Sequence, residues 1–173
     1  MDLEKFIRDV PDFPKPGILF KDITTLLQDG DAFRLAVNRM LKKHLDGDAR
    51  IAKVLGIEAR GFILGGVMAY KLGCGFVPAR KPGKLPYRSL REEYTLEYGM
   101  NSLEVHEDAI LPGERVLVVD DLLATGGTAL AAARLVEKLG GEVAAVEFMV
   151  ELSFLNGRQK LSGYKVHSLI TCA

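Results

Sequence analysis

The chain has 173 residues, of which 48% are hydrophobic and 27% are charged, the proportions of one ordinary globular domain with a full core. Lysine plus arginine and aspartate plus glutamate each number 23, so the formal net charge is zero, which argues against nucleic acid as the main partner. No run of about 18 apolar residues occurs and the acidic start lacks an apolar segment, so we expect neither a membrane span nor a signal peptide.

The hydrophobic pattern predicts alternating helices and strands. In the first half these are a short amphipathic helix over 3–10, an extended loop over 11–17, a helix capped by Asp31 that continues to Leu45, a strand over 51–56, a buried helix over 61–72 that ends at Gly73, and a strand over 75–80. In the second half they are a long polar loop over 81–93, a hairpin that pairs 94–98 with 103–105, a strand over 116–119, a helix over 128–139, and strands over 143–150 and 166–170. This alternation predicts a parallel α/β sheet with right-handed crossovers.

The most informative stretch is Val116–Thr128. Four apolar strand-forming residues run into two adjacent carboxylates, Asp120 and Asp121, and then into a small loop with two glycines. Such a run is typical of a strand buried on both faces, and in open α/β sheets ligands bind beyond the carboxyl ends of the strands. The loop Ala124–Thr128 precedes a helix, whose unpaired N–H groups and dipole favour an anion. A phosphate beside two carboxylates that accept from a diol describes a ribose 5-phosphate.

Other interpretations of this stretch fit less well. A P-loop needs a lysine and then serine or threonine after its glycines, and a dinucleotide fingerprint needs G-x-G-x-x-G, whereas only the pair Gly126-Gly127 is present. A glycine-rich turn with one capping aspartate would be purely structural. Two consecutive acids at the end of a buried strand are seldom placed there without a partner, which favours a binding site.

Val116–Thr128 resembles the phosphoribosyl pyrophosphate (PRPP) signature of type I phosphoribosyltransferases, and its second half is similar to the adenine-specific branch of that family. Further segments resemble the family in the same order over nearly the whole chain: a base-binding segment (13–23), a pyrophosphate loop (58–62), a mobile loop (80–86 and 94–99) and a C-terminal stretch (150–158). The resemblance implies a single domain over 1–173. Its fold would be α/β, a central, mainly parallel sheet flanked by helices, with a small N-terminal base-binding hood (1–30) and a mobile loop (81–98).

The resemblance also implies a role for each matching residue. The 5′-phosphate would be bound by Ala124, Thr125, Gly126, Gly127 and Thr128. The pyrophosphate would be bound by Glu58, Ala59, Arg60, Lys81 and Lys84, with a cis peptide between Glu58 and Ala59. Adenine would be bound by Leu19, Phe20, Lys21, Arg60 and Leu122, with Phe20 and Leu122 on its two faces. Asp120 and Asp121 would bind the ribose and act in catalysis with Glu97, the presumed acid/base or charge partner near the base, while Tyr98 completes the loop over the site.

Several of these residues also have plain structural interpretations, which the sequence leaves open. Arg60 could be a surface arginine paired with Glu58. The basic run with Lys81 and Lys84 could be a solvated loop, and Phe20 could pack in the core. A strand glutamate such as Glu97 is usually solvated. The three histidines, His44, His106 and His167, and the two cysteines, Cys74 and Cys172, are interpreted as structural.

The activity that the resemblance implies is transfer of the 5-phosphoribosyl group of PRPP to N9 of adenine, giving AMP and pyrophosphate. Mg²⁺ would be carried by PRPP oxygens and water, with no direct protein ligand. We expect a cytoplasmic homodimer whose partners are the small molecules adenine and PRPP, with no nucleic acid or membrane. Two alternatives remain open: a phosphoribosyltransferase for another purine, such as xanthine or hypoxanthine, and a non-catalytic PRPP-sensing regulator.

Overall fold

The computed structural model describes residues 1–45, 50–96 and 99–173. Glu97 and Tyr98 therefore lie outside the described residues. The chain divides into two compact units, Met1–Arg39 and Met40–Ala173, and each is described by itself. Within the described ranges, no helix is both long enough and apolar enough to cross a membrane.

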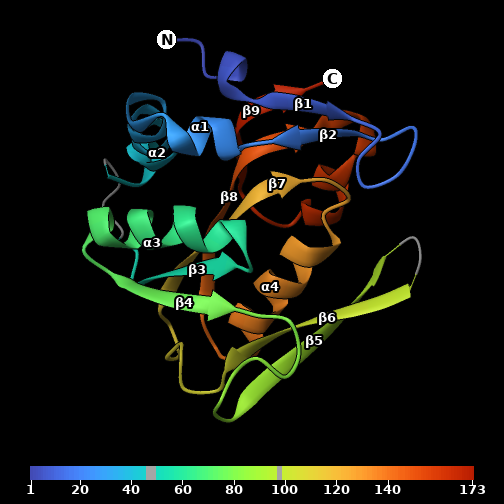
Figure 1. The fold of residues 1–173 in the computed structure, drawn as a ribbon. Coiled ribbons are helices and arrows are strands. Elements are labelled where there is room, and N and C mark those ends of the chain that lie inside the picture. Colours follow the sequence, from blue (N-terminus) through green and yellow to red (C-terminus); the bar gives the residue numbers. More distant parts are fainter. Residues whose placement is uncertain (46–49, 97–98) are drawn as a thin grey trace. The chain divides into compact units, whose positions relative to one another are not determined.

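The larger unit is built on a sheet of five parallel strands in the order β4-β3-β7-β8-β9 (Figure 1). Their bounds are Lys53–Ile57 for β3, Gly75–Ala79 for β4, Arg115–Leu123 for β7, Glu142–Leu152 for β8 and Val166–Cys172 for β9. The central strands β7 and β8 are apolar and buried along most of their length, as expected for strands covered on both faces. The predicted α/β class with a parallel sheet is confirmed.

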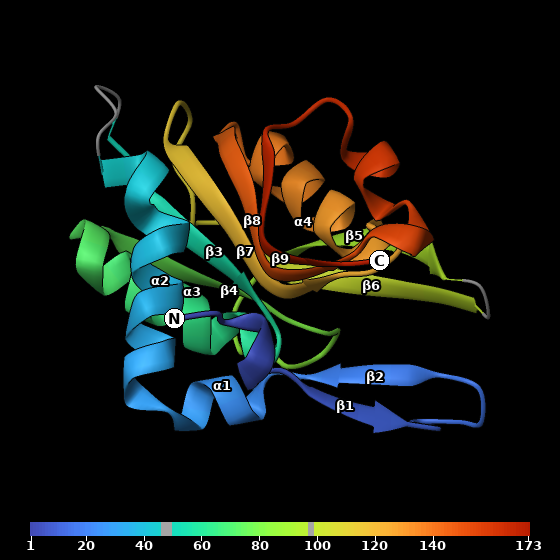
Figure 2. The ribbon, with the colours of Figure 1, turned by 90° about the horizontal axis from the view of Figure 1, so that it is seen from above.

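Helices α3 (Arg60–Leu72) and α4 (Gly127–Lys138) cover opposite faces of this sheet (Figure 2). From β3 the chain crosses over to β4 through α3, and from β7 it crosses in the other direction to β8 through α4. Right-handed crossovers in opposite directions place their helices on opposite faces. The loops after β3 and β7 are consequently neighbours at the point where the strand order reverses, which is where such sheets bind ligands.

A long antiparallel hairpin packs on α4. It consists of β5 (Ser89–Leu96) and β6 (Gly99–His106). The hairpin places Leu103 and Val105 in the same buried cluster as the apolar side chains of α4. This cluster also takes in the α4 side of the sheet, so hairpin, helix and sheet share one core.

The prediction of a loop over 81–93 is wrong in its second half, because β5 begins at Ser89. Leu90 and Tyr94 alternate along β5 with the period of a strand and pack against the core. Glu92 lies between them and hides the alternation, yet it is only 8% exposed. Its carboxylate is paired with Lys138 of α4, so a charged residue takes a core-facing position.

The smaller unit departs further from the sequence-based expectation. It contains the short 3-10 helix η1 (Glu4–Phe6), the hairpin of β1 (Arg8–Pro11) and β2 (Leu19–Asp22), helix α1 (Thr24–Gln28) and most of α2 (Gly30–Leu45). The predicted helix over 3–10 is wrong because its second half pairs with β2 and satisfies its backbone groups as a strand. Helix α1 was not predicted.

The predicted cap of α2 is displaced by two residues. Oδ1 of Asp29, not Asp31, accepts hydrogen bonds from the backbone N–H groups of Asp31 and Ala32, at 3.1 and 2.8 Å. Gly30 then starts the helix, whose described residues run to Leu45. Either aspartate satisfies the capping pattern in sequence, and only the backbone geometry selects between them.

Candidate functional site

The two adjacent acids lie near the carboxyl end of β7, which continues to Leu123. Asp121 is only 5% exposed, and its backbone N–H donates to Oδ1 of Asp120 at 2.8 Å. Burial and the like charge of Asp121 raise the pKa of the Asp120 carboxyl well above its usual range. The pair therefore has an excess of negative charge that hydroxyl donors or a cation would relieve.

Arg60 joins the loop after β3 to these acids. Its Nε lies 2.5 Å from Oδ2 of Asp121, while its side chain remains 40% exposed. The structural alternative, a surface pair with Glu58, is therefore not the arrangement found. The close approach depends on Gly61, where a Cβ atom would come within 2.9 Å of the Val119 carbonyl oxygen. A bulkier residue would push the start of α3 away from β7.

Glu58 is the anchor of the basic loop that follows β4. Its Oε1 accepts from Nζ of Lys84 at 2.6 Å, and its Oε2 accepts from the backbone N–H of Lys81 at 3.0 Å. Burial acts to raise the pKa of Glu58, but the hydrogen bonds from Lys84 and Lys81, with the charges of Lys84 and Arg80, lower it overall. The predicted cis peptide between Glu58 and Ala59 is confirmed. The carboxylate thus organises cations at the switch point.

Arg80 was not predicted as part of the site. Its Nε lies 3.4 Å from Oε2 of Glu58, and its Nη1 donates to the carbonyl oxygen of Lys84 at 3.1 Å. Its backbone also pairs with Glu104 of β6, whose carboxylate accepts from the N–H of Gly83 at 3.0 Å. Arg80 and Glu104 therefore hold the loop in place from both sides. The sequence pattern did not indicate the contacts with Glu58 and Glu104, because both lie more than 20 residues from Arg80.

The loop between β7 and α4 has the geometry of an anion site. Gly126, the N-cap residue of α4, has φ of 80°, in the left-handed region that favours glycine, and as a glycine it offers no side chain to cap the first turn. The first N–H groups of the helix are therefore left for a ligand, and an anion there also gains from the helix dipole. Thr125 and Thr128 flank the loop with partly buried side chains.

Gly157 supports this loop from behind and was not assigned a role from sequence. It opens the 3-10 helix η3 (Gly157–Leu161), which follows η2 (Ser153–Leu155). A Cβ atom at Gly157 would collide with the carbonyl oxygen of Ala124, and one at Gly126 would collide with the carbonyl oxygen of Gly157. The resemblance of the C-terminal stretch 150–158 to the family indicated that this segment matters, but it did not assign a role to Gly157.

The three base-binding candidates lie side by side on β2 of the smaller unit. Leu19 is 49% exposed, and Nζ of Lys21 is 2.7 Å from Oδ1 of Asp9. Phe20 is partly buried and meets Phe13 edge-on, with ring centroids 5.2 Å apart, so it is not a core residue. The contact with Phe13 holds the ring within the hairpin.

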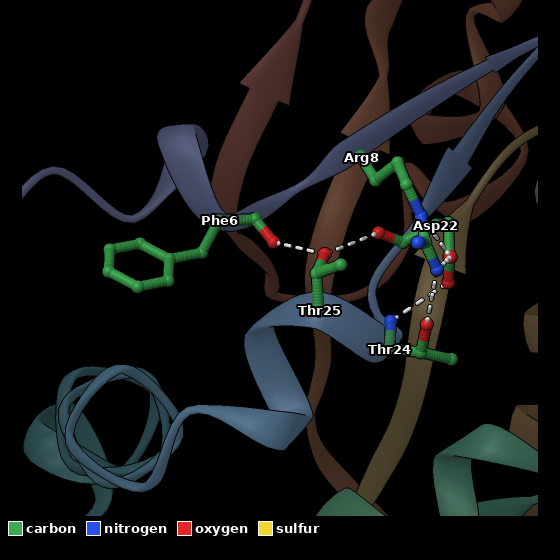
Figure 3. A network of polar contacts seen from close by, with 5 residues as sticks. All are labelled: Phe6, Arg8, Asp22, Thr24 and Thr25. Carbon is green, nitrogen blue, oxygen red and sulfur yellow. Dashed lines mark hydrogen bonds and ion pairs between the residues drawn. The ribbon is translucent and has the colours of Figure 1, made fainter.

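A polar network fixes the end of β2 onto α1 (Figure 3). Asp22 accepts from Nη2 of Arg8 at 2.6 Å and from the backbone N–H of Thr24 at 2.9 Å, and these bonds lower its pKa to about 2. Oγ1 of Thr25 donates to the carbonyl oxygen of Phe6 at 2.6 Å. The network gives the base-binding candidates a defined backbone.

The larger unit therefore brings together most of the predicted PRPP residues. Those near the strand ends are Glu58, Ala59, Arg60, Lys84, Asp120, Asp121, Leu122 and the loop 124–128. Lys81 joins them through its backbone, and its side chain is exposed. Leu19, Phe20 and Lys21 lie in the smaller unit, and Glu97 and Tyr98 fall outside the described residues.

The comparisons with known proteins agree with this geometry. The phosphoribosyl transferase domain family matches residues 24–167. The adenine phosphoribosyltransferase of Thermotoga neapolitana is 62% identical over 170 residues, which cover 98% of this chain and 99% of that protein. The chain belongs to the adenine phosphoribosyltransferase family. The enzyme class expected from sequence, a transferase, is confirmed.

Solved structures of the family confirm the fold as well. The adenine phosphoribosyltransferase from Thermoanaerobacter pseudethanolicus is 55% identical, with a TM-score of 0.93 over 99% of this chain and 100% of that chain. The Saccharomyces cerevisiae enzyme is 39% identical, with a TM-score of 0.91 over 96% of each chain. It was solved in complex with adenine and an imino-altritol bisphosphate.

Proposed function

We propose that this chain transfers the 5-phosphoribosyl group of PRPP to N9 of adenine, giving AMP and pyrophosphate. The observation that carries the proposal is the paired acids Asp120 and Asp121 beside an uncapped, glycine-bearing helix start, with the Glu58–Arg60 loop on the neighbouring strand. The adenine complex of the yeast relative supports adenine as the base.

The loop 124–128 is proposed to hold the 5′-phosphate. Backbone N–H groups at the start of α4 and the hydroxyls of Thr125 and Thr128 are the donors that a phosphate needs. Asp120 and Asp121 are proposed to accept from the two ribose hydroxyls. Those hydrogen bonds favour the ionised carboxylates, so substrate binding relieves the repulsion between the acids.

The basic side is proposed to receive the pyrophosphate, with Arg60, Lys81 and Lys84 as cations and the backbone at Glu58-Ala59 as a further contact. Lys84 is paired with Glu58 and would exchange part of that contact for phosphate oxygens. Arg60 reaches Asp121 through Nε, and it is also proposed to contact the purine at N7. The ion pairs of Arg60 and Lys84 keep these two cations oriented before substrate arrives, which lowers the cost of binding.

Mg²⁺ is proposed as the metal of the reaction. The side chains present fit an ion that is carried by PRPP. Asp121 is already bonded to Arg60, and Asp120 accepts from a backbone N–H. Their carboxylate oxygens would therefore contact Mg²⁺ through ribose hydroxyls and water, and not as direct ligands. When bound, Mg²⁺ supplies positive charge that offsets the charge of the leaving pyrophosphate. The paired acids stabilise the cationic character that develops at the anomeric carbon.

Adenine is proposed to stack between Phe20 and Leu122, with the backbones of Leu19 and Lys21 reading its Watson–Crick edge. Glu97 is proposed as the acid/base or charge partner near the base, and Tyr98 as part of the loop that closes over it. Such closure would exclude water, which would otherwise hydrolyse PRPP.

We further propose a cytoplasmic homodimer. Cys74 and Cys172 form no disulfide with each other, which suits a reducing compartment. Ile63 and Tyr70 lie on one side of α3, seven residues apart, and are 47% and 87% exposed. Exposed apolar side chains on one helical face are suited to contact with a second copy.

One assay tests the proposed reaction. Purified protein is incubated with PRPP, Mg²⁺ and labelled adenine, hypoxanthine, guanine or xanthine in parallel, and nucleotide formation is measured. We expect AMP from adenine and at most traces from the other bases. A higher rate with another purine would make that purine, and not adenine, the substrate. PRPP binding without turnover of any base would favour a non-catalytic regulator.

A further inference from the structure

Two histidines and a glutamate meet on the sheet of the larger unit. His44 lies in the last turn of α2, Glu147 in β8 and His167 in β9. Nε2 of His44 is 2.7 Å from Oε1 of Glu147, and Nδ1 of His167 is 2.5 Å from the same oxygen. Their ligand atoms all lie within 4.8 Å of one another. The sequence-based interpretation of both histidines as structural did not anticipate this convergence.

The cluster lies on the face of the sheet opposite α4. Val146 and Phe148 of β8 belong to the core that α4 covers, so Glu147 between them points to the other face. Its side chain is 2% exposed and that of His44 is 8% exposed, whereas that of His167 is 28% exposed. A buried carboxylate needs compensation, and solvent reaches this one from the His167 side.

We propose that His44, Glu147 and His167 form a binding site for one divalent transition-metal ion, with Zn²⁺ as the preferred ion. Two imidazoles and one carboxylate are a common protein ligand set for zinc, with a water in the fourth position. Mg²⁺ prefers oxygen ligands, so this site is chemically distinct from the Mg²⁺ that accompanies PRPP. The proposal does not depend on the proposed function.

The geometry requires only local adjustment. Ligand atoms around a tetrahedral zinc ion lie about 3.3 Å apart, given bonds of about 2.0 Å. The two N–O distances of 2.7 and 2.5 Å are those of hydrogen bonds to a shared oxygen, so the carboxylate and rings would separate by less than about 1 Å. The two ring nitrogens, which lie within 4.8 Å of each other, would approach by at most about 1.5 Å. To bind the ion, Nε2 of His44 and Nδ1 of His167 must be unprotonated, so the hydrogen of each neutral ring would lie on the other ring nitrogen.

Metal binding would act on the fold. His44 lies more than 100 residues before Glu147 and His167 in the chain, so an ion bound to all three would tie the last turn of α2 to β8 and β9. Because the unfolded chain does not hold these ligands together, binding free energy becomes folding free energy. The ion therefore has a structural role, and loss of one ligand weakens both binding and stability.

The test uses tag-free, full-length protein that has been dialysed against a chelator and then titrated with Zn²⁺ in a calorimeter. We expect binding of one ion per chain, and a rise in melting temperature of about 5 °C or more at saturating zinc. Loss of a residue that only hydrogen-bonds to a metal ligand typically weakens metal binding by about 10- to 100-fold. His167→Gln removes a ligand itself and should weaken zinc binding by more than that. His44→Gln should do the same, and His167→Gln remains informative if the buried His44 variant does not fold.

His106→Gln is the matched control, because His106 is the remaining one of the three histidines and lies on β6, outside the cluster. It should bind zinc like the parent protein, and circular dichroism of each variant checks the fold. Absence of one-to-one zinc binding in the parent protein, or binding that persists unchanged in both cluster variants, would overturn the proposal. The cluster would then be a hydrogen-bonded triad that satisfies a buried carboxylate.

Discussion

Arg60 and Asp121 form a close ion pair between two neighbouring strands, with Nε and Oδ2 2.5 Å apart. Arg60 comes from the loop after β3 and Asp121 from the carboxyl end of β7, so the pair connects the proposed pyrophosphate loop to the proposed ribose site. Any ligand that engages one of these side chains changes the charge environment of the other. This coupling makes the acid pair the natural first target for mutation.

The double variant Asp120→Asn, Asp121→Asn should fold but lose turnover almost completely. The amides keep the shape of the side chains but remove the charges that accept from ribose hydroxyls and stabilise the anomeric cation. The measurement is AMP formation from adenine and PRPP, with circular dichroism as the check on folding. Near-normal activity in a folded double variant would remove these acids from the mechanism.

Asp120→Asn alone should stabilise the ligand-free protein at about pH 8 and change it little at about pH 4. The raised pKa means that the folded state holds the Asp120 proton to higher pH than the unfolded chain does, so the free energy of unfolding falls as pH rises through the interval between the two pKa values. The neutral amide avoids that loss. Each kcal/mol gained corresponds to about 2–4 °C in melting temperature for a chain of this length.

Calorimetric scans at both pH values measure this difference, and Asp121→Asn is the comparison because it removes the partner of Arg60. Equal melting temperatures for the parent and Asp120→Asn at the higher pH would show that the acid pair is not under electrostatic strain in the free protein.

Gly157→Ala should disrupt the loop 124–128, because the added methyl group would collide with the Ala124 carbonyl oxygen. Overpacking of this kind costs about 1–3 kcal/mol, and here the displaced atoms belong to the proposed phosphate site. We expect a higher KM for PRPP and lower stability. Gly163→Ala is the matched control, since a Cβ atom there meets nothing within 4 Å. Equal kinetics for the two variants would exclude a supporting role for Gly157.

Glu97→Gln should lower kcat more than it weakens PRPP binding, by about 100-fold or more if the carboxylate transfers a proton. The reason is that its partner charge develops mainly in the transition state. Steady-state kinetics are compared with equilibrium PRPP binding on the same preparation. An unchanged kcat would leave positioning and charge neutralisation by the basic loop as the main contributions to catalysis.

The proposed homodimer should be visible by light scattering at assay concentration. Ile63→Glu places a charge on the exposed side of α3 and should shift the protein toward the monomer if that face is the interface. Glu107→Lys, a charge change in an exposed turn after β6, serves as the surface control. A parent protein that is monomeric and fully active would refute the dimer.

The sequence by itself determined the elements whose character is local. The apolar run of β7, the acids near its end and the glycine pair at the start of α4 carry their own preferences for strand, turn and helix, so the fold class and the strand–loop–helix order of this segment were predictable. Gly73 at the end of α3 was predictable for the same reason, because a left-handed cap depends on one residue.

Only the tertiary structure decided which distant side chains meet. It paired Arg60 with Asp121 rather than with Glu58, and it placed Gly157 against the loop that begins at Ala124. Part of a segment that is polar in sequence also forms β5, where the buried carboxylate of Glu92 is paired with Lys138 on α4. Contacts of this kind depend on strand order and crossover direction, and a one-dimensional pattern of hydrophobic and polar residues does not contain the distances between positions far apart in the chain.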